Sequence, residues 1–299
     1  MKNKQIILTG ACGQLGLTIK ERWGSSSLSE KYELVCKDKA QLDITSKISL
    51  ENTFKNQNIS AVINTAAYTA VDKAESEQDE AYLLNEFAPQ NLASCSMKYS
   101  FTLIHVSTDF VFSGENTTPY LISDVTGPQN IYGKSKRAGE IAISKESPNL
   151  STVIRTSWLY SCHRNNFVKS MIRQMSEKEQ LCVVSDQVGS PTSTDSLVDL
   201  IFTMLKTEDY SGVYHWSDSG SVSWYDFALV IQDYCLGAGL LKKRIPIIPI
   251  STDQYPTPAR RPKYSVLDLS LTKERYSIEP KPWKESLKQV IDRIADKEK

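Results

Sequence analysis

The sequence predicts an α/β fold: a Rossmann-like, doubly wound parallel sheet with a smaller C-terminal substrate-binding region. Two observations predict it. Short apolar runs alternate with helix-like stretches along residues 5–160, which is the pattern of parallel strands joined by helical crossovers. A glycine-rich turn follows the first apolar run. The runs are nearly continuous in apolar residues, as expected of strands that are buried on both faces.

The elements of the first part of the chain follow from this alternation. The expected strands cover residues 5–10, 32–36, 60–67, 101–108 and 151–160. The expected helices cover residues 14–23, 46–58, 76–99 and about 131–146.

The alternation of strands and helices becomes less regular after residue 160. Helices are expected at 166–175, 194–205, 223–235 and about 283–296, and strands at 180–186 and 212–218. The proline-rich stretch 245–262 should be extended or turn-like. We therefore predict a dinucleotide-binding domain over residues 1–157, completed by about 194–218. The substrate region would comprise residues 158–193 and 219–299.

Composition excludes several classes of protein. The 35 basic residues equal the 35 acidic ones, so nucleic-acid binding has no electrostatic support. No apolar run reaches the roughly 18 residues of a membrane span. The six cysteines, at 12, 36, 95, 162, 182 and 235, lack the close spacing of a zinc site or a disulfide framework. We expect a reduced, cytoplasmic protein without a metal centre.

The stretch "TGACGQLG" carries glycines at positions 10, 13 and 16. Such a turn lets the backbone approach a pyrophosphate, and the following helix N-terminus favours the negative charge. A tight turn without a ligand is the alternative. Asp38 follows this turn by about 20 residues, where an acidic residue meets an adenosine ribose in dinucleotide sites. Lys37 and Lys39 flank it and could hold a 2′-phosphate, so NAD and NADP both stay open.

Tyr132 and Lys136 stand four residues apart in "NIYGKSKRAGE", on one face of an expected helix. A nearby ammonium should lower the pKa of the phenol and make it a better proton exchanger. The alternative is an ordinary helix surface, because this pair is common by chance.

The motifs "TGACGQLG" (9–16), "STDFVFSG" (107–114) and "YGKSK" (132–136) together resemble the extended short-chain dehydrogenases/reductases. Five further stretches narrow the resemblance to the dTDP-4-dehydrorhamnose reductases. They are "LDIT" (42–45), "NTAAYTAVDKAE" (64–75), "RTSWLY" (155–160), "DQVGSPT" (186–192) and "ARRPKYSVLD" (259–268). The resemblance covers nearly the whole chain.

The resemblance implies NADPH or NADH as cofactor. The cofactor-binding positions it implies are Gly10, Cys12, Gly13, Gln14, Leu15, Gly16, Asp38, Lys39, Asp43, Ile44, Ala66, Ala67, Tyr68, Tyr132 and Lys136. Asp43 could equally belong to a helix N-cap region.

The resemblance also implies a catalytic set of Thr108, Tyr132 and Lys136. Tyr132 would donate a proton to the oxygen of the reduced ketone. Lys136 would stabilise the phenolate and hold the nicotinamide ribose, and Thr108 would hydrogen-bond the oxygen. Phe110 stands where sugar-nucleotide 4,6-dehydratases carry a carboxylate, which argues for reduction and against dehydration.

The substrate-binding positions implied are Val71, Thr108, Asp109, Phe110, Trp158, Asn166, Gln187 and Arg261. Trp158 would pack on the sugar, with a core aromatic as the alternative. Arg261 would hold the diphosphate through its forked donors, while Arg260 points to solvent. The loop "LYSCHRNNF" departs from the glycine-containing loop expected after "SWLY".

Some members of the family are thought to dimerise through a magnesium ion held by a glutamate of the first helix. Thr18 occupies the matching position and is a weak magnesium ligand, so we expect no such metal bridge. The implied partner is a small sugar nucleotide; neither nucleic acid nor membrane is expected, and a homodimer is compatible with the sequence.

The resemblance implies reduction of the C4 ketone of dTDP-4-dehydro-L-rhamnose to dTDP-L-rhamnose. One alternative is another sugar-nucleotide 4-ketoreductase or epimerase. A second is a non-catalytic, NADP-binding regulatory subunit like the methionine adenosyltransferase β subunit.

Overall fold

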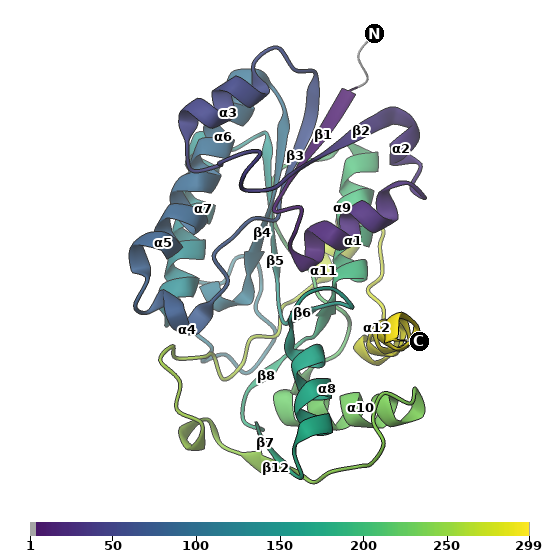
Figure 1. The fold of residues 1–299 in the computed structure, drawn as a ribbon. Helices are drawn as coiled ribbons and strands as arrows, with labels where there is room; N and C mark the ends of the chain where they lie inside the picture. Colours follow the sequence, from purple (N-terminus) through teal and green to yellow (C-terminus); the bar gives the residue numbers. More distant parts are fainter. Residues whose placement is uncertain (1–3, 299) are drawn as a thin grey trace.

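The computed structural model describes residues 4–298. Its centre is a six-stranded sheet in the order β10-β5-β4-β3-β1-β2, with every neighbouring pair parallel (Figure 1). The strands are β1 (Lys4–Thr9), β2 (Tyr32–Lys37), β3 (Ile59–Asn64), β4 (Thr102–Thr108), β5 (Ser151–Thr156) and β10 (Gly212–His215). The predicted Rossmann-like α/β fold is confirmed.

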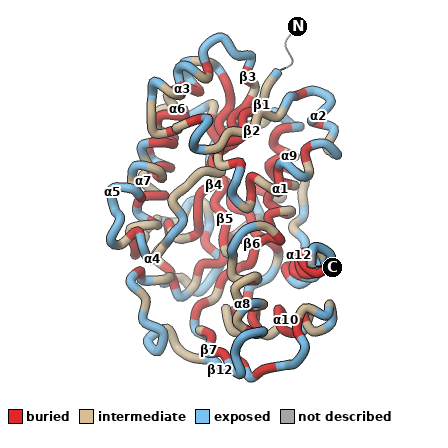
Figure 2. Tube along the Cα trace, in the orientation of Figure 1, coloured by how far each residue is buried: buried red, intermediate tan, exposed pale blue. Residues whose placement is uncertain are grey.

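Helices cover both faces of this sheet (Figure 1). One face carries α1 (Gln14–Trp23), α2 (Leu28–Lys31), α9 (Thr194–Thr207) and α11 (Ser270–Tyr276). The other face carries α3 (Lys47–Phe54), α6 (Ala88–Tyr99) and α7 (Ile131–Glu146). Each face has its own apolar core, and the buried residues follow the sheet and the inward sides of the helices (Figure 2).

The topology opens a crevice beside β1. This strand lies between β2 and β3, so the chain leaves β1 toward one face of the sheet and leaves β3 toward the other. In open parallel sheets the crevice at the carboxyl ends of such strands is where ligands bind. The glycine-rich turn follows β1 and therefore lies at this crevice.

A smaller layer lies below the sheet in Figure 1. It contains α8 (Phe167–Glu177), α10 (Trp224–Gly237) and α12 (Trp283–Glu298), with β7 (Leu181–Val184) paired to β12 (Ile247–Ile250). Two-residue strands form the other pairs, β6 (Leu159–Tyr160) with β9 (Thr192–Ser193) and β8 (Val188–Gly189) with β11 (Val222–Ser223). A separate apolar core is formed by residues between 160 and 294. The predicted domain division stays a prediction; α11, from the predicted substrate region, packs on the core of the central sheet. Residues 1–3 and 299 of that division lie outside the described residues.

Several predicted bounds are wrong for identifiable reasons. The strand expected at 151–160 ends at Thr156, because Trp158 has a φ of 46° and cannot continue it. The helix expected at 46–58 ends at Phe54, ahead of Asn56 with a φ of 61°. The helix expected at 76–99 is divided into α5 (Gln78–Tyr82), a π-helical turn (Leu83–Phe87) and α6.

Three short helices, α2, α4 (Val71–Ala74) and α11, were not expected from the sequence, because so few residues show no period. Within residues 4–298 no helix is both long and apolar enough to cross a membrane.

Candidate active site

A cleft of about 670 Å³ lies at the carboxyl ends of β1 to β5. Its lining brings together the glycine turn, the loop after β2, the end of β4, the start of α7 and the segment after β5. The predicted residues that line it are Gly10, Cys12, Gly13, Gln14, Leu15, Asp38, Lys39, Asp43, Ile44, Ala66, Ala67, Thr108, Asp109, Tyr132, Lys136 and Trp158. The structure thus gathers most of the predicted cofactor residues and all three predicted catalytic residues in one place, but only a minority of the predicted substrate residues.

The glycine turn is shaped by backbone contacts. Gly10 has a φ of 67°, and a Cβ atom there would lie 2.6 Å from the backbone nitrogen of Ala66. Any larger residue would push β1 and β3 apart. Gly13 is the N-cap of α1 and offers no side chain to its first turn, so the N–H groups of that turn are available to an anion.

Two predicted cofactor residues do not line the cleft. Gly16 packs α1 onto the turn: a Cβ atom there would lie 2.5 Å from the carbonyl oxygen of Gly10. Tyr68 is held by its neighbours, with its backbone N–H donating to Oδ1 of Asn85 at 2.9 Å and its hydroxyl donating to Glu77.

The two predicted acidic residues order the loop after β2. Oδ1 of Asp38 accepts from the backbone N–H of Gln41 at 3.0 Å. Oδ1 of Asp43 accepts from the backbone and side chain of Thr45 at 2.9 and 2.7 Å. These hydrogen bonds hold the pKa of Asp43 below its usual value. Lys37 lines the cleft beside Asp38, as does Lys39. These are the two lysines that the sequence suggested for binding a 2′-phosphate.

The packing of α7 brings Tyr132 to the end of β4. Oδ1 of Asn130 caps the helix by accepting from the N–H of Gly133 at 2.7 Å. A Cβ atom on Gly133 would lie 2.2 Å from the carbonyl oxygen of Phe110, so only glycine allows this approach. The ring of Phe110 meets Tyr132 edge-on at 5.7 Å between centroids.

The side chains of Thr108 and Tyr132 interact at the cleft. Burial raises the pKa of Tyr132 to about 12, although the hydrogen bond with Thr108 opposes this. The expectation that Lys136 lowers this pKa is therefore wrong, because desolvation of the phenol is the larger effect. The phenol is fully protonated at neutral pH, as a proton donor must be.

Lys136 is almost completely buried, with 2% of its surface exposed. Its Nζ donates to the carbonyl oxygen of Val106 at 2.7 Å and lies 3.1 Å from Nε2 of His105. Burial lowers the pKa of Lys136 to about 8, against the opposing charge of Glu140. Burial, and then the charge of Lys136, place the pKa of His105 well below its usual value, so the imidazole is neutral and can accept a hydrogen bond.

A buried polar chain continues from His105. Its Nδ1 lies 2.9 Å from Nδ2 of Asn64, whose Oδ1 accepts from the hydroxyl of Thr9 at 2.6 Å. The chain therefore links Lys136 to the last residue of β1. These three residues were not predicted, although each is a polar residue within an apolar run, "IILT", "AVIN" or "LIHV".

A buried ion pair fixes α7 against the sheet. Arg155 of β5 donates from Nη2 to Oε2 of Glu140 at 2.8 Å and from Nε to Oε1 at 3.0 Å. Ser107 of β4 donates to the same carboxylate at 2.5 Å. Glu140 lies one helical turn beyond Lys136, so these bonds fix the part of α7 that carries the lysine.

Asp109 is buried beside the Thr108–Tyr132 pair. Burial raises its pKa to about 6, while hydrogen bonds with Ser265 and Thr108 act in the opposite direction. Phe110 follows it on a 3₁₀ turn and carries no acidic group.

Trp158 lines the other side of the cleft. Its ring stacks on that of Trp224, 3.4 Å between centroids and 6° between planes. Its left-handed backbone is costly for a residue of this size, so the packing holds the ring at the cleft. Trp224 was not predicted, because its contact with Trp158 spans two distant segments.

Five predicted substrate residues do not line the cleft; one is Phe110, whose ring packs on Tyr132. Val71 begins α4, and Asn166 caps α8 by accepting from the N–H of Lys169. Nε2 of Gln187 donates to the hydroxyl of Thr252 at 3.1 Å. Arg261 makes a bidentate ion pair with Asp72, at 2.7 and 3.0 Å.

Arg164 and Asn165 also line the cleft and were not predicted. Nε of Arg164 donates to the carbonyl oxygen of Cys12 in the glycine turn at 2.8 Å. Arg164 has a φ of 51°, in the loop whose sequence departs from the expected glycine-containing one.

Residues 4–296 match the RmlD substrate binding domain. The chain is 36% identical to dTDP-4-dehydrorhamnose reductase of Aggregatibacter actinomycetemcomitans, over 96% of this chain and 98% of that protein. It is 33% identical to dTDP-4-dehydrorhamnose reductase of Escherichia coli K12, over 97% of each.

The solved structures include a similar dTDP-4-dehydrorhamnose reductase from Bacillus anthracis, determined in complex with NADP. It superposes with a TM-score of 0.90 at 36% identity and covers 97% of this chain and 99% of that one. The chain therefore belongs to the RmlD substrate binding domain family, that of the dTDP-4-dehydrorhamnose reductases.

Proposed function

We propose that this protein is an NAD(P)H-dependent reductase that converts the C4 ketone of dTDP-4-dehydro-L-rhamnose to the alcohol of dTDP-L-rhamnose. The observation that carries the proposal is that the side chains of Thr108 and half-buried Tyr132 meet at the same cleft as the glycine turn. The identity of the sugar and of its nucleotide is taken from the relatives that match nearly the whole chain, which are named dTDP-4-dehydrorhamnose reductases.

The cleft fits a dinucleotide. The open N-terminus of α1 and the turn at Gly10 suit a pyrophosphate. Lys37 and Lys39 would pair with a 2′-phosphate, and the B. anthracis relative was solved with NADP. We therefore propose NADPH as the preferred cofactor and NADH as the alternative. When bound there, the reduced cofactor would supply the hydride that adds to C4 of the sugar.

The proposed roles of the side chains follow from their protonation. Tyr132 is a neutral phenol. It gives its proton to the oxygen at C4 as the alkoxide develops, and Tyr132 itself is left as a phenolate. The hydroxyl of Thr108 hydrogen-bonds the same oxygen. Lys136 offsets the charge left on the phenolate, one helical turn away. Its own charge is maintained by the acceptors His105 and Val106.

Trp158 is the residue we propose to pack against the sugar, on the platform of Trp224. Asp109 and Phe110 stay proposed substrate contacts at the end of β4. Val71, Asn166, Gln187 and Arg261 stay predictions of the resemblance; for Arg261 to hold a diphosphate, its ion pair with Asp72 must open. A homodimer and a cytoplasmic location also stay predictions, the first testable by sedimentation equilibrium.

The decisive experiment follows NADPH absorbance with dTDP-4-dehydro-L-rhamnose as substrate. We expect one NADPH consumed and one dTDP-L-rhamnose formed per sugar. An epimerase would change the sugar without net consumption of cofactor. A regulatory subunit would bind NADPH in an equilibrium titration and consume none, and either result would overturn the proposal.

A further inference from the structure

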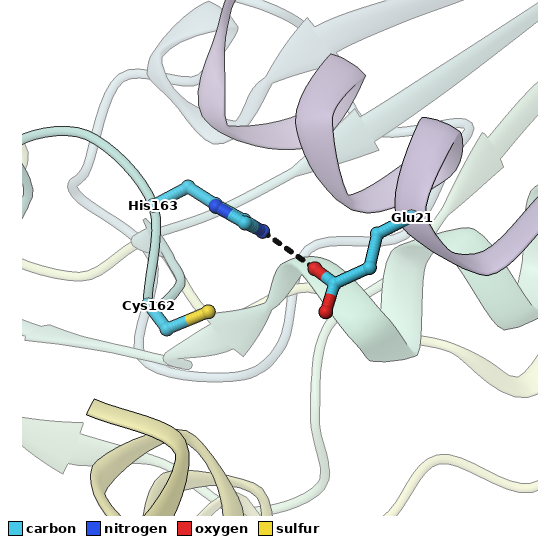
Figure 3. A group of neighbouring side chains, drawn as sticks. All are labelled: Glu21, Cys162 and His163. Carbon is cyan, nitrogen blue, oxygen red and sulfur yellow. Dashed lines mark hydrogen bonds and ion pairs between the residues drawn. The ribbon is translucent and has the colours of Figure 1, made fainter. Parts of the chain in front are cut away.

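Three side chains that are typical metal ligands meet outside the cleft (Figure 3). Glu21 comes from α1, and Cys162 and His163 come from the loop between β6 and α8. The carboxylate oxygen, the sulfur and the ring nitrogen all lie within 4.8 Å of one another. The three groups therefore converge from two segments that are distant in the sequence.

The chemistry of this set suits a borderline divalent cation. A thiolate, an imidazole and a carboxylate are the three ligand types that zinc uses, at about 2.0–2.3 Å from the metal. Nε2 of His163 already lies 2.8 Å from Oε2 of Glu21. Cys162 is buried, with 6% of its surface exposed, whereas Glu21 is exposed to solvent. The set thus has an apolar side and an open side from which an ion and a water can enter.

Two cations border the set and must be accommodated. Nζ of Lys297 lies 3.4 Å from the sulfur of Cys162. Lys297 is exposed, so its side chain can swing into solvent when an ion arrives. Arg293 donates to Oε2 of Glu21 at 2.8 Å and to Oδ2 of Asp195 at 2.7 Å. It keeps Asp195 as a partner if Glu21 turns toward a metal.

We propose that Glu21, Cys162 and His163 form a binding site for Zn²⁺ or a similar transition-metal cation, with water as the fourth ligand. On binding, the thiol of Cys162 loses its proton to solvent. The sulfur ligand selects against Mg²⁺, which prefers oxygen. The site is separate from Thr18, whose hydroxyl is bonded to that of Thr194 at 2.8 Å.

The proposed metal site is next to a residue that contacts the glycine turn of the cleft. The next residue after His163 is Arg164, which donates to the carbonyl oxygen of Cys12. A bound cation would tie α1 to this loop at the point where the loop covers the glycine turn. Metal binding should therefore stabilise the folded protein by linkage.

The first test uses Co²⁺ as a spectroscopic probe on the full chain. We expect one equivalent to bind and to give thiolate-to-cobalt charge-transfer absorption together with the intense visible bands of a tetrahedral ion. Cys162→Ser should abolish the charge-transfer band. Cys182→Ser, which removes an exposed cysteine of β7, is the matched control and should keep it. Loss of the band in the control alone, or a band retained in Cys162→Ser, would overturn the proposal.

The second test does not depend on a buried substitution. Glu21→Gln and His163→Gln change groups that are exposed or half-buried, and each should weaken Zn²⁺ binding by roughly tenfold or more, measured by competition with a chelating dye. Zn²⁺ should raise the melting temperature of the wild type and raise it less in both variants. Mg²⁺ at the same concentration should do neither. Equal affinity in wild type and both variants, or equal effects of Mg²⁺ and Zn²⁺, would overturn the proposal.

Discussion

Nε2 of His105 lies 3.1 Å from Nζ of Lys136, and both side chains are buried in the sheet–helix interface behind the cleft. In the tautomer protonated at Nδ1, the neutral imidazole is one of two acceptors for the ammonium; the other is the carbonyl oxygen of Val106. Because burial already lowers the pKa of Lys136 to about 8, the loss of either acceptor favours the uncharged amine. His105 is thus a positioning residue for the proposed catalytic lysine.

We predict that His105→Leu lowers kcat at neutral pH. Leaving a buried charged donor short of an acceptor costs about 1–3 kcal/mol, which corresponds to roughly a 5- to 150-fold loss of rate. The pH profile should show the pKa of Lys136 moved further below 8. His105→Gln restores an acceptor and should recover part of the rate. A purely structural role would lower the melting temperature of both variants without moving the pH profile.

Tyr132→Phe tests the proton donor. The substitution keeps the ring against Phe110 and removes the hydroxyl that bonds Thr108. Loss of a general acid should reduce kcat by about 10²–10⁴, with the dissociation constant of NADPH nearly unchanged. A variant that retained more than half of the wild-type rate would rule out this role.

Arg164 should contribute to cofactor affinity through its charge at the glycine turn. Both Arg164→Ala and Arg164→Gly remove the guanidinium, but only glycine relieves the left-handed backbone. We expect both to weaken NADPH binding by about tenfold in fluorescence titrations, as for loss of a charge-assisted hydrogen bond. Arg244→Ala, at an exposed arginine paired with Asp233, is the control. A loss with alanine but not with glycine would assign the effect to the backbone instead.

The fold was predictable because the signals that specify it are local. Apolar runs, the glycine turn and the alternation with helices lie within short windows, and the crevice follows from strand order. The cofactor and catalytic residues implied by the resemblance mostly line one cleft at the carboxyl ends of the strands, and their roles stay predictions.

The remaining features depend on contacts between distant segments. The stacking of Trp158 on Trp224 and the ion pair of Arg261 with Asp72 each join segments that are far apart in the sequence. The lowered pKa expected for Tyr132 was wrong for a similar reason. The four-residue spacing showed only that Lys136 is near Tyr132. The burial of Tyr132, which depends on the whole fold, decides the direction in which its pKa shifts.

Asp109 should make stability depend on pH. Its pKa is about 6 in the folded protein and near 3.8 when unfolded. Between these values the folded state holds a proton that the unfolded chain has released, so stability falls as pH rises from about 4 to about 6. Asp218 acts in the same direction. The contribution of Asp109 is therefore the difference in the free energy of unfolding between wild type and Asp109→Asn, measured with urea. Asp109→Asn should become more stable relative to wild type as pH rises from about 4 to about 6. A difference that stays constant over this range would contradict the assignment.

The last prediction concerns the class of reaction. Asp109 stands at the end of β4, but Phe110 follows it, and its ring meets only the edge of Tyr132. Abstraction of the C5 proton of a sugar therefore has no carboxylate at this position. Incubation with dTDP-glucose and NAD⁺ should yield no 4-keto-6-deoxy sugar, whereas dTDP-4-dehydro-L-rhamnose should consume one reduced cofactor per molecule. Phe110→Glu supplies the missing carboxylate beside the phenol. Appearance of the 4-keto-6-deoxy product with the wild-type enzyme would mean that another residue acts as the base, and the reductase would have to be reassigned as a dehydratase.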